Sequence, residues 1–302
     1  MFKKLNFKIK YAIDNSTIIS VFPFNYFKKL ADCIRLNLWN MPLKLRNEWL
    51  RRIDDVLECE DRKFIVHHPL AGKIEGEHLI MHNGIRIKPL SYYGYPMLRM
   101  FKLSKGVHEP QEERVFQEVL KVMPPGATML ELGSYWAFYS MWFQKTVPDA
   151  RCCMVEPEEA GLKSGKENFE INGLQGDFTR AFIGNEYKES SPPILSVDWI
   201  LSNKNIPFLD LLHSDIQGFE LQMLEGASHA FSQGKIGYVF ISTHSNQVHD
   251  ACENKLRDYG HVILHSINLD HSYSEDGLIV AARPDSPRIP VFQLSRRSQN
   301  SK

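Results

Sequence analysis

An acid and an imidazole each follow an apolar run, and the two runs lie far apart along this chain. Asp215 comes directly after residues 209–214, and His244 follows the run that ends at Thr243. In open α/β sheets, binding and catalysis take place at the carboxyl ends of the strands. We therefore expect Asp215 and His244 to face one cleft. There the imidazole can accept a proton near neutral pH, and the carboxylate can orient it or bind a metal ion.

The segment from Thr128 to Ala137, TMLELGSYWA, has the pattern of a strand, a tight turn and a helix start. Gly133 allows the turn, and an apolar run follows it into the helix. Glu156 then stands at the tip of the next strand, where acids of doubly wound nucleotide folds accept hydrogen bonds from ribose hydroxyls. This layout indicates a cofactor that carries adenosine.

The spacing of glycines separates two such cofactors. A dinucleotide site needs the pattern G-x-G-x-x-G for close approach of the backbone to a pyrophosphate, but Tyr135 and Phe138 occupy the positions that would have to be small. S-adenosylmethionine carries no phosphate, so Gly133 alone suffices, with Glu131 near the cationic methionine end and Glu156 at the ribose. The residues therefore favour S-adenosylmethionine, and an NAD-dependent oxidoreductase is the weaker alternative.

A second motif, FLDLLHSDIQGFELQMLEGA at residues 208–227, is more specific. With it, the chain resembles the FkbM family of S-adenosylmethionine-dependent O-methyltransferases over residues 106–284. The other matching motifs are Glu131–Ser134, Glu156-Pro157 and Asn172-Gly173. The family often has Lys-Ile-Asp-Val-Glu-Gly where this chain has HSDIQG at His213–Gly218, and Tyr135-Trp136 replaces smaller residues of the first turn. These departures bear on the acceptor more than on the fold. The resemblance implies a Rossmann-like class I methyltransferase fold of α/β type, with a seven-stranded, mostly parallel sheet and helices on both faces.

The implied reaction is transfer of the sulfonium methyl group to a hydroxyl of a sugar, a glycan or another natural product. Such a displacement requires the acceptor oxygen to be held in line and its proton to be removed as the new bond forms. His244 is the candidate general base, and Asp215 orients it or binds a divalent metal. A non-catalytic protein that binds an adenosine cofactor, its site partly filled by Tyr135-Trp136, is an alternative from another class.

Asp215, His244 and Glu220 are also candidate ligands for Mg²⁺ or another divalent metal, since some sugar O-methyltransferases that the chain resembles use magnesium. A second explanation needs no metal. Asp215 could cap the helix that follows it, and Glu220 could lie in the first turn of that helix, where a negative charge is favoured by about 0.3–1 kcal/mol. Both explanations stay open on the sequence.

Three further residues are expected to contact the cofactor. Ser134 can donate to the methionine carboxylate, and Phe182 can pack on the adenine at the end of the third strand. Glu109 precedes the first helix of the methyltransferase region, where it either touches the cofactor or favours the helix start. The full set of expected cofactor contacts is Glu109, Glu131, Gly133, Ser134, Tyr135, Glu156, Pro157 and Phe182.

Composition excludes several classes of function. The 302 residues are 43% apolar, and 36 acidic residues balance 36 basic ones, so a small-molecule or glycan acceptor is expected and nucleic acid is not. Five cysteines without C-x-x-C spacing indicate neither a disulfide framework nor a zinc site, and favour the cytoplasm. The apolar stretch Ile18–Phe27 is too short to cross a bilayer, so no transmembrane segment is predicted. Assembly into a homo-oligomer stays open.

Strands and helices alternate after residue 105, as in a parallel sheet covered on both faces. We predict an accessory region at 1–105 that shapes the acceptor pocket, a methyltransferase domain at 106–284 and a tail at 285–302. The accessory region contains a hairpin signal at Asn83-Gly84 and an aromatic cluster at Tyr92–Pro96, which is either a lid, a sugar-stacking wall or structural packing. Expected elements farther along include a strand at 179–183, one helix over 219–231, and an antiparallel pair at 262–266 and 277–282.

Overall fold

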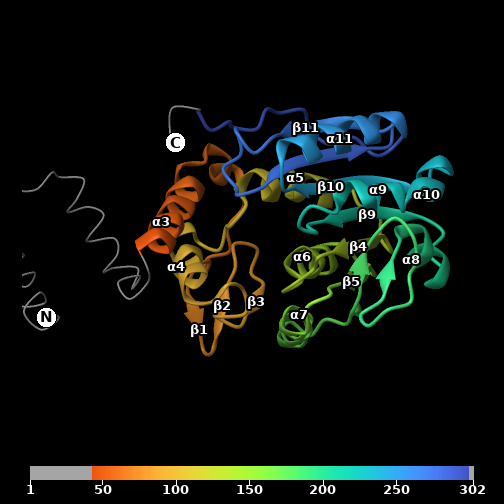
Figure 1. Ribbon diagram of the computed structural model, residues 1–302. Coiled ribbons are helices and arrows are strands. Elements are labelled where there is room, and N and C mark those ends of the chain that lie inside the picture. Colours follow the sequence, from red (N-terminus) through yellow and green to blue (C-terminus); the bar gives the residue numbers. More distant parts are fainter. Residues whose placement is uncertain (1–42, 299–302) are drawn as a thin grey trace, which may run out of the picture. The chain divides into compact units, whose positions relative to one another are not determined.

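The computed structural model describes residues 43–298 (Figure 1). The chain forms two compact units, residues 1–51 and 52–302, and helix α3 (Leu43–Glu58) spans their boundary. This division does not test the predicted boundaries at 105 and 284, which stay predictions. The apolar stretch Ile18–Phe27 lies outside the described residues. Among residues 43–298, no helix combines the length and the apolar character needed to span a membrane.

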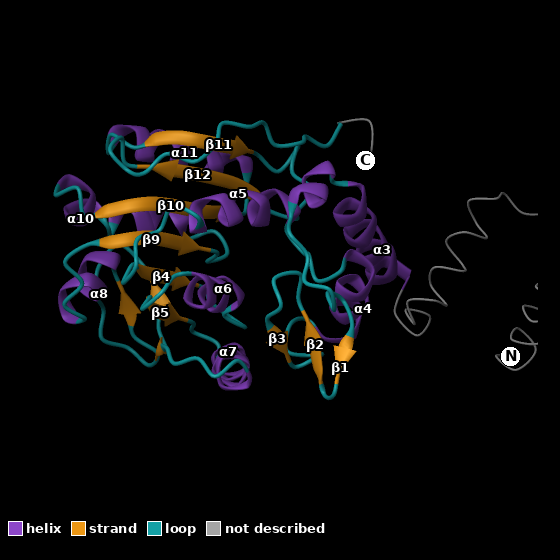
Figure 2. Cartoon of the chain, turned by 180° about the vertical axis from the view of Figure 1, so that it is seen from behind, coloured by secondary structure: helices purple, strands orange, loops and turns teal. Residues whose placement is uncertain are grey.

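A seven-stranded sheet organises the described part of the second unit (Figures 1 and 2). Its strands are β4 (Thr128–Leu132), β5 (Arg151–Val155), β6 (Asp177–Thr179), β9 (Leu209–Ser214), β10 (Ile236–Thr243), β11 (Val262–Ile267) and β12 (Gly277–Ala282). Their spatial order is β11-β12-β10-β9-β4-β5-β6. The neighbours β10, β9, β4, β5 and β6 pair in parallel, whereas β12 pairs antiparallel with both β10 and β11. The predicted α/β class and mostly parallel sheet are confirmed.

Helices cover both faces of this sheet (Figure 2). One face is apolar: Leu130 and Leu132 of β4 join a core shared with helices α8 (Val197–Asn203), α9 (Glu220–Glu225), α10 (Ser228–Ser232) and α11 (Asn246–Asp258). The other face packs on α5 (Pro110–Leu120) and α6 (Phe138–Thr146) through aromatic rings. The ring centroids of Phe116 and Phe240 lie 5.5 Å apart there. Successive side chains of each strand point to opposite faces, so they pack alternately on the core of α8 to α11 and on the aromatic layer of α5 and α6.

A small antiparallel sheet precedes the main one and consists of β1 (Ile74–Glu75), β2 (His78–Ile80) and β3 (Arg86–Ile87). The turn between β2 and β3 contains Gly84 at φ +80°, so the predicted hairpin is confirmed. Helix α7 (Glu159–Ile171) holds this sheet by two asparagines near its end. Asn172 Oδ1 accepts from the backbone N–H of Arg86 at 3.0 Å, and Asn168 Oδ1 accepts from that of Lys88 at 3.1 Å.

The predicted strand at 179–183 is divided in the structure. The main sheet ends with β6 at Thr179, and Phe182–Ile183 form β7, which pairs with β8 (Ile194–Leu195) in a separate two-stranded sheet. The reason is a different set of backbone partners: the N–H of Phe182 donates to Pro193 O at 2.8 Å. Phe182 was expected to end the third strand of the main sheet. That prediction is wrong, because Phe182 belongs to β7.

The predicted helix at 219–231 is likewise divided, into α9 and α10. Asp198 causes the break: its backbone N–H donates to Gly226 O at 2.9 Å. Its carboxylate then accepts from the N–H groups of His229 and Ala230 at 3.0 and 2.8 Å, which caps the start of α10. The pattern also did not reveal α4 (Gly94–Ser104), the 3-10 helix η2 (Glu60–Phe64), α8 or α11.

Candidate functional site

A cavity of about 550 Å³ opens where β4, β5 and β9 end. This is the carboxyl edge of the parallel strands, where ligands bind in open α/β sheets, and the volume lies in the range of about 300–1,000 Å³ found for small-molecule sites. Six of the predicted catalytic and cofactor-binding residues line it: Gly133, Tyr135, Glu156, Pro157, Phe182 and Asp215.

Gly133, directly after β4, lies close to the backbone of Asp215, directly after β9. Its φ is +72°, and a Cβ placed there would overlap the carbonyl oxygen of Asp215 and lie 2.8 Å from the carbonyl carbon. The backbone N–H of Asp215 donates to Leu132 O at 2.9 Å. A side chain at position 133 would therefore disturb both the turn and the placement of Asp215.

Glu156 holds the same turn from the side of β5. Its two carboxylate oxygens accept from the backbone N–H groups of Tyr135 at 2.9 Å and of Glu158 at 2.8 Å. Burial raises the pKa of Glu156 above its ordinary value. The N–H groups of Gly133 and Ser134 both donate to Val155 O, so the turn is fixed by backbone and carboxylate acceptors together.

Three expected cofactor contacts do not line the cavity. Glu131 is 3% exposed, and its Oε2 accepts from the N–H of Ser140 in the first turn of α6 at 3.0 Å. Burial raises the pKa of Glu131 to about 7. Ser134 is buried beside the turn, and Glu109 accepts from the Tyr139 hydroxyl at 3.0 Å and pairs with Arg52 at 3.8 Å. In this structure Glu131 and Glu109 contact neighbouring elements, whereas the Ser134 Oγ is buried without a hydrogen-bond partner among the described residues.

Aromatic rings form one wall of the cavity. Tyr93 stacks on Tyr135 with ring centroids 5.4 Å apart, and both residues line the space. Tyr92 also lines the cavity and stacks on Trp136, which is only 4% exposed, with ring centroids 4.5 Å apart. Tyr92 and Tyr93 of the predicted aromatic cluster thus reach the cavity, whereas Trp136 belongs to the packing behind it.

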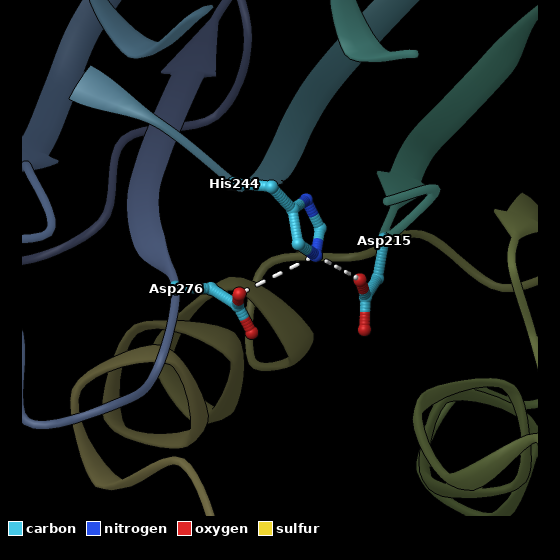
Figure 3. Close-up of side chains that lie close together, drawn as sticks. All are labelled: Asp215, His244 and Asp276. Atoms are coloured by element: carbon cyan, nitrogen blue, oxygen red, sulfur yellow. Dashed lines mark ion pairs between the residues drawn. The ribbon is translucent and has the colours of Figure 1, made fainter. Parts of the chain in front are cut away.

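His244 lies between two aspartates at the edge of the sheet (Figure 3). Its Nε2 is 3.2 Å from Asp215 Oδ1 and 3.3 Å from Asp276 Oδ1. Asp215 follows β9, His244 follows β10, and Asp276 directly precedes β12. The structure therefore brings together Asp215 and His244, which are far apart in sequence, and adds Asp276. Their catalytic roles stay predictions.

Glu220 faces the opposite nitrogen of the same ring. Its Oε1 lies 2.7 Å from His244 Nδ1 and also accepts from the N–H of Gly218 at 2.9 Å. An ion bound to Nε2 would lie between the two aspartates, on the side of the imidazole ring opposite to Glu220. Glu220 could not bind the same ion. The side chains whose ligand atoms lie together at Nε2 are thus Asp215, His244 and Asp276, while Glu220 lies at Nδ1. Metal binding by any of them stays a prediction.

Charge around the imidazole favours its protonated form. Burial by itself lowers the pKa of His244, but the carboxylates of Asp215 and Glu220, with Asp276, raise it to about 10. Burial, and after it the charge of Asp215, raises the pKa of Asp276 to about 7.

Asp276 is the residue that sequence reasoning missed. A signal existed, because 277–282 was predicted as an antiparallel strand. An antiparallel strand begins at the edge where its parallel neighbours end, so the residue before Gly277 had to lie near His244. His213 is the opposite case. It is two residues from Asp215, yet its Nε2 lies 2.6 Å from Glu112 Oε1 beneath α5, away from the group.

The chain was compared with protein families, curated proteins and solved structures. Residues 150–263 match the family model described as the Methyltransferase FkbM domain. A search of curated proteins found no match.

Similar solved structures include the precorrin-6y C5,15-methyltransferase of Geobacter metallireducens GS-15, at 12% identity and a TM-score of 0.40, with 57% of this chain and 88% of that chain covered. Another is M. capricolum TrmK in complex with S-adenosyl-homocysteine, at 15% identity and a TM-score of 0.39, with 57% and 69% covered. A third is the ribosomal protein L11 methylase of Lactobacillus delbrueckii subsp. bulgaricus, at 12% identity and a TM-score of 0.40, with 58% and 79% covered. The match at residues 150–263, inside the span over which the motifs predicted the resemblance, identifies this segment as a methyltransferase domain of the FkbM family.

Proposed function

We propose that this protein transfers a methyl group from S-adenosylmethionine to a hydroxyl group of a small molecule, such as a sugar, a glycan or another natural product. The observation that carries the proposal is the continuity of one cavity. It is lined by Gly133 and Glu156, the expected contacts of an adenosine cofactor, and it extends to Asp215, which adjoins His244.

The hydrogen bonding of the glycine turn supports S-adenosylmethionine over a dinucleotide. A pyrophosphate is bound by free backbone N–H groups at the start of a helix. Here the N–H groups of Gly133 and Ser134 donate to Val155 O, that of Tyr135 donates to Glu156, and that of Ala137 donates to Ser134 O. These groups have no further proton to give to a phosphate. A cofactor without phosphates fits this turn.

The residues at the edge of the cavity suit the removal of a hydroxyl proton. S-adenosylmethionine would supply an electrophilic methyl group, and an acceptor oxygen beside Asp215 would lie within reach of His244. In this proposal His244 Nε2 accepts the proton while Asp215 orients the ring. With the pKa of His244 raised to about 10, Nε2 carries a proton at neutral pH in the absence of another cation. The base role therefore requires that this proton first leave.

Calorimetry tests the cofactor. The protein should bind S-adenosylmethionine, and Glu156→Gln should weaken binding about 10-fold or more, because hydrogen bonds to a charged acceptor contribute about 1.5–3 kcal/mol. Glu159→Gln is the matched control, since Glu159 is exposed and is not among the residues that line the cavity. Tight binding of NAD with no binding of S-adenosylmethionine would overturn the proposal.

Transfer of a labelled methyl group tests the reaction. Hydroxylated sugars and natural products should be labelled, and His244→Ala and Asp215→Ala should abolish turnover while cofactor binding persists. Unchanged turnover in both variants would remove these residues from the mechanism. A tRNA sample belongs in the same assay, because labelling of tRNA alone would contradict a small-molecule acceptor. Cofactor binding without transfer to any acceptor would favour the alternative of a non-catalytic binding protein.

A further inference from the structure

We infer that Asp215, His244 and Asp276 form a binding site for a divalent cation, with Glu220 as the residue that orients the histidine. The inference rests on the proposed function in one respect: a cation at this point would contact the acceptor hydroxyl at the edge of the cofactor cavity. The site itself follows from the positions and the hydrogen bonding of these four side chains.

The first step is the distance between donor atoms. Two ligands at about 2.1 Å from an octahedral ion, in adjacent positions, lie about 3.0 Å apart. His244 Nε2 lies 3.2 Å from Asp215 Oδ1 and 3.3 Å from Asp276 Oδ1, and the three donor atoms all lie within 4.8 Å of one another. The ligand atoms therefore already have nearly the spacing that one shared ion would impose.

The second step is the direction of the histidine nitrogen. His244 Nε2 is buried, and despite both short distances it has no partner with acceptable hydrogen-bond geometry. Figure 3 shows the nitrogen pointing between the two aspartates and not along a line to either one. A ring nitrogen directed between two carboxylates is a position that a cation can take in place of the proton on Nε2.

The third step is the tautomer. Glu220 is fully buried, and its Oε1 accepts from the N–H of Gly218, so this oxygen is an acceptor toward His244 Nδ1 as well. A neutral His244 therefore carries its proton on Nδ1 and leaves the lone pair on Nε2. A carboxylate that fixes the far nitrogen in this way commonly supports histidines that bind metal ions.

The fourth step is charge and access. The side chains of Asp215 and Asp276 are 31% and 20% exposed, so the remaining coordination positions face solvent and the cavity. Two carboxylates and one imidazole suit a hard or borderline ion such as Mn²⁺ or Mg²⁺. A bound cation would also compensate the repulsion between the two aspartates. When bound, such an ion would lower the pKa of a hydroxyl group that coordinates it. His244 would then hold the ion through Nε2 and would not itself accept the hydroxyl proton.

Titration of the full-length protein with Mn²⁺, followed by the paramagnetic resonance signal of the free ion, tests this site without cofactor or turnover. The wild type should bind one Mn²⁺ per chain. Asp276→Asn should weaken binding by about 100-fold or more, and Glu220→Gln by about 10- to 100-fold, as for other residues that support metal ligands. Asp149→Asn is the matched control. Asp149 is exposed, and its φ of +54° suits asparagine, so Mn²⁺ binding should not change.

Two results would overturn the inference: no Mn²⁺ binding by a wild-type protein that binds S-adenosylmethionine, or equal Mn²⁺ affinity in the wild type and Asp276→Asn. If thermal unfolding shows that Asp276→Asn does not fold, Asp215→Asn decides in its place, with the same expected loss and the same contrary outcome. The failure of the proposed function is separate. Mn²⁺ binding by a protein that does not bind S-adenosylmethionine would leave this site intact and would remove the cofactor assignment.

Discussion

Replacing Gly133 by alanine should cost more stability than the backbone angle alone explains. Gly133 has φ +72°, and a left-handed conformation costs a residue with a Cβ about 1–2 kcal/mol. The new Cβ would also overlap the carbonyl oxygen of Asp215. Forcing extra volume into a packed site costs about 1–3 kcal/mol more. The expected total is about 2–5 kcal/mol.

Gly126→Ala provides the matched control. Gly126 has φ +79°, close to that of Gly133, but a Cβ at this position would meet no atom within 4 Å. Only the backbone cost of about 1–2 kcal/mol should appear there. Thermal unfolding measures the difference, since each kcal/mol lowers the midpoint by about 2–4 °C in a domain of this size class.

The same variant should affect the proposed site, because Asp215 must move to admit the methyl group. We expect weaker binding of S-adenosylmethionine by Gly133→Ala and unaltered binding by Gly126→Ala, each measured by calorimetry well below its unfolding midpoint. Equal losses of stability in the two variants would refute the reasoning. They would mean that the backbone relaxes without cost and that the approach of Gly133 to Asp215 does not constrain the site.

Two further predictions concern Glu131 and Phe182. Burial raises the pKa of Glu131 from 4.5 to about 7, so the folded protein keeps a proton that the unfolded chain releases, and this group should lower stability by about 3 kcal/mol as the pH rises from 4.5 to 7. Glu131→Gln should therefore gain stability relative to the wild type between about pH 5 and about pH 8 in chemical denaturation, and a difference that does not change with pH would contradict this. Phe182 is 44% exposed and lines the cavity, so Phe182→Ala should weaken S-adenosylmethionine binding about 2- to 10-fold if the ring packs on the adenine, whereas Leu90→Ala, which also removes an exposed apolar side chain, should not. Equal affinities of the two variants would place the adenine elsewhere.

The sequence predicted the parts of the fold that depend on local pattern. Apolar runs of strand length, bounded by turn residues, located β4, β5, β9 and β10, and Asn83-Gly84 located the hairpin. The pattern failed where a distant segment decides the outcome. Asp198 interrupts the helix at Gly226 from 28 positions away, and Pro193 draws Phe182 out of the main sheet. Such partners leave no mark in the apolar periodicity of the segments that they interrupt.

In the candidate site, too, some residues could be located from the local pattern and others could not. Gly133, Glu156 and Asp215 all line the cavity, because each directly follows a strand and the carboxyl ends of parallel strands share one edge. Their roles stay predictions. Glu131 was expected near the cofactor; its buried side chain accepts from the N–H of Ser140 in α6 and does not line the cavity. The position of a residue in its strand shows which edge of the sheet it lies near. The face to which its side chain points depends on the alternation along the strand, and the pattern of a strand followed by a glycine turn does not show this.

The short segment from Asp215 to Glu220 explains how one histidine comes to have carboxylates at both nitrogens. Its first residue is fixed to β4 by the hydrogen bond from Asp215 N to Leu132 O. Gln217 and Gly218 then both adopt positive φ, +56° and +100°, which turns the chain sharply. A non-glycine residue with positive φ costs about 1–3 kcal/mol and persists only where its surroundings require it. Here the turn brings Glu220 to Nδ1 while Asp215 faces Nε2, and Gln217 Nε2 donates to Asp215 Oδ1 at 3.1 Å. The orientation of His244 is thus set by backbone geometry within six residues of β9, which is the rigidity that either proton transfer or coordination of a cation would require.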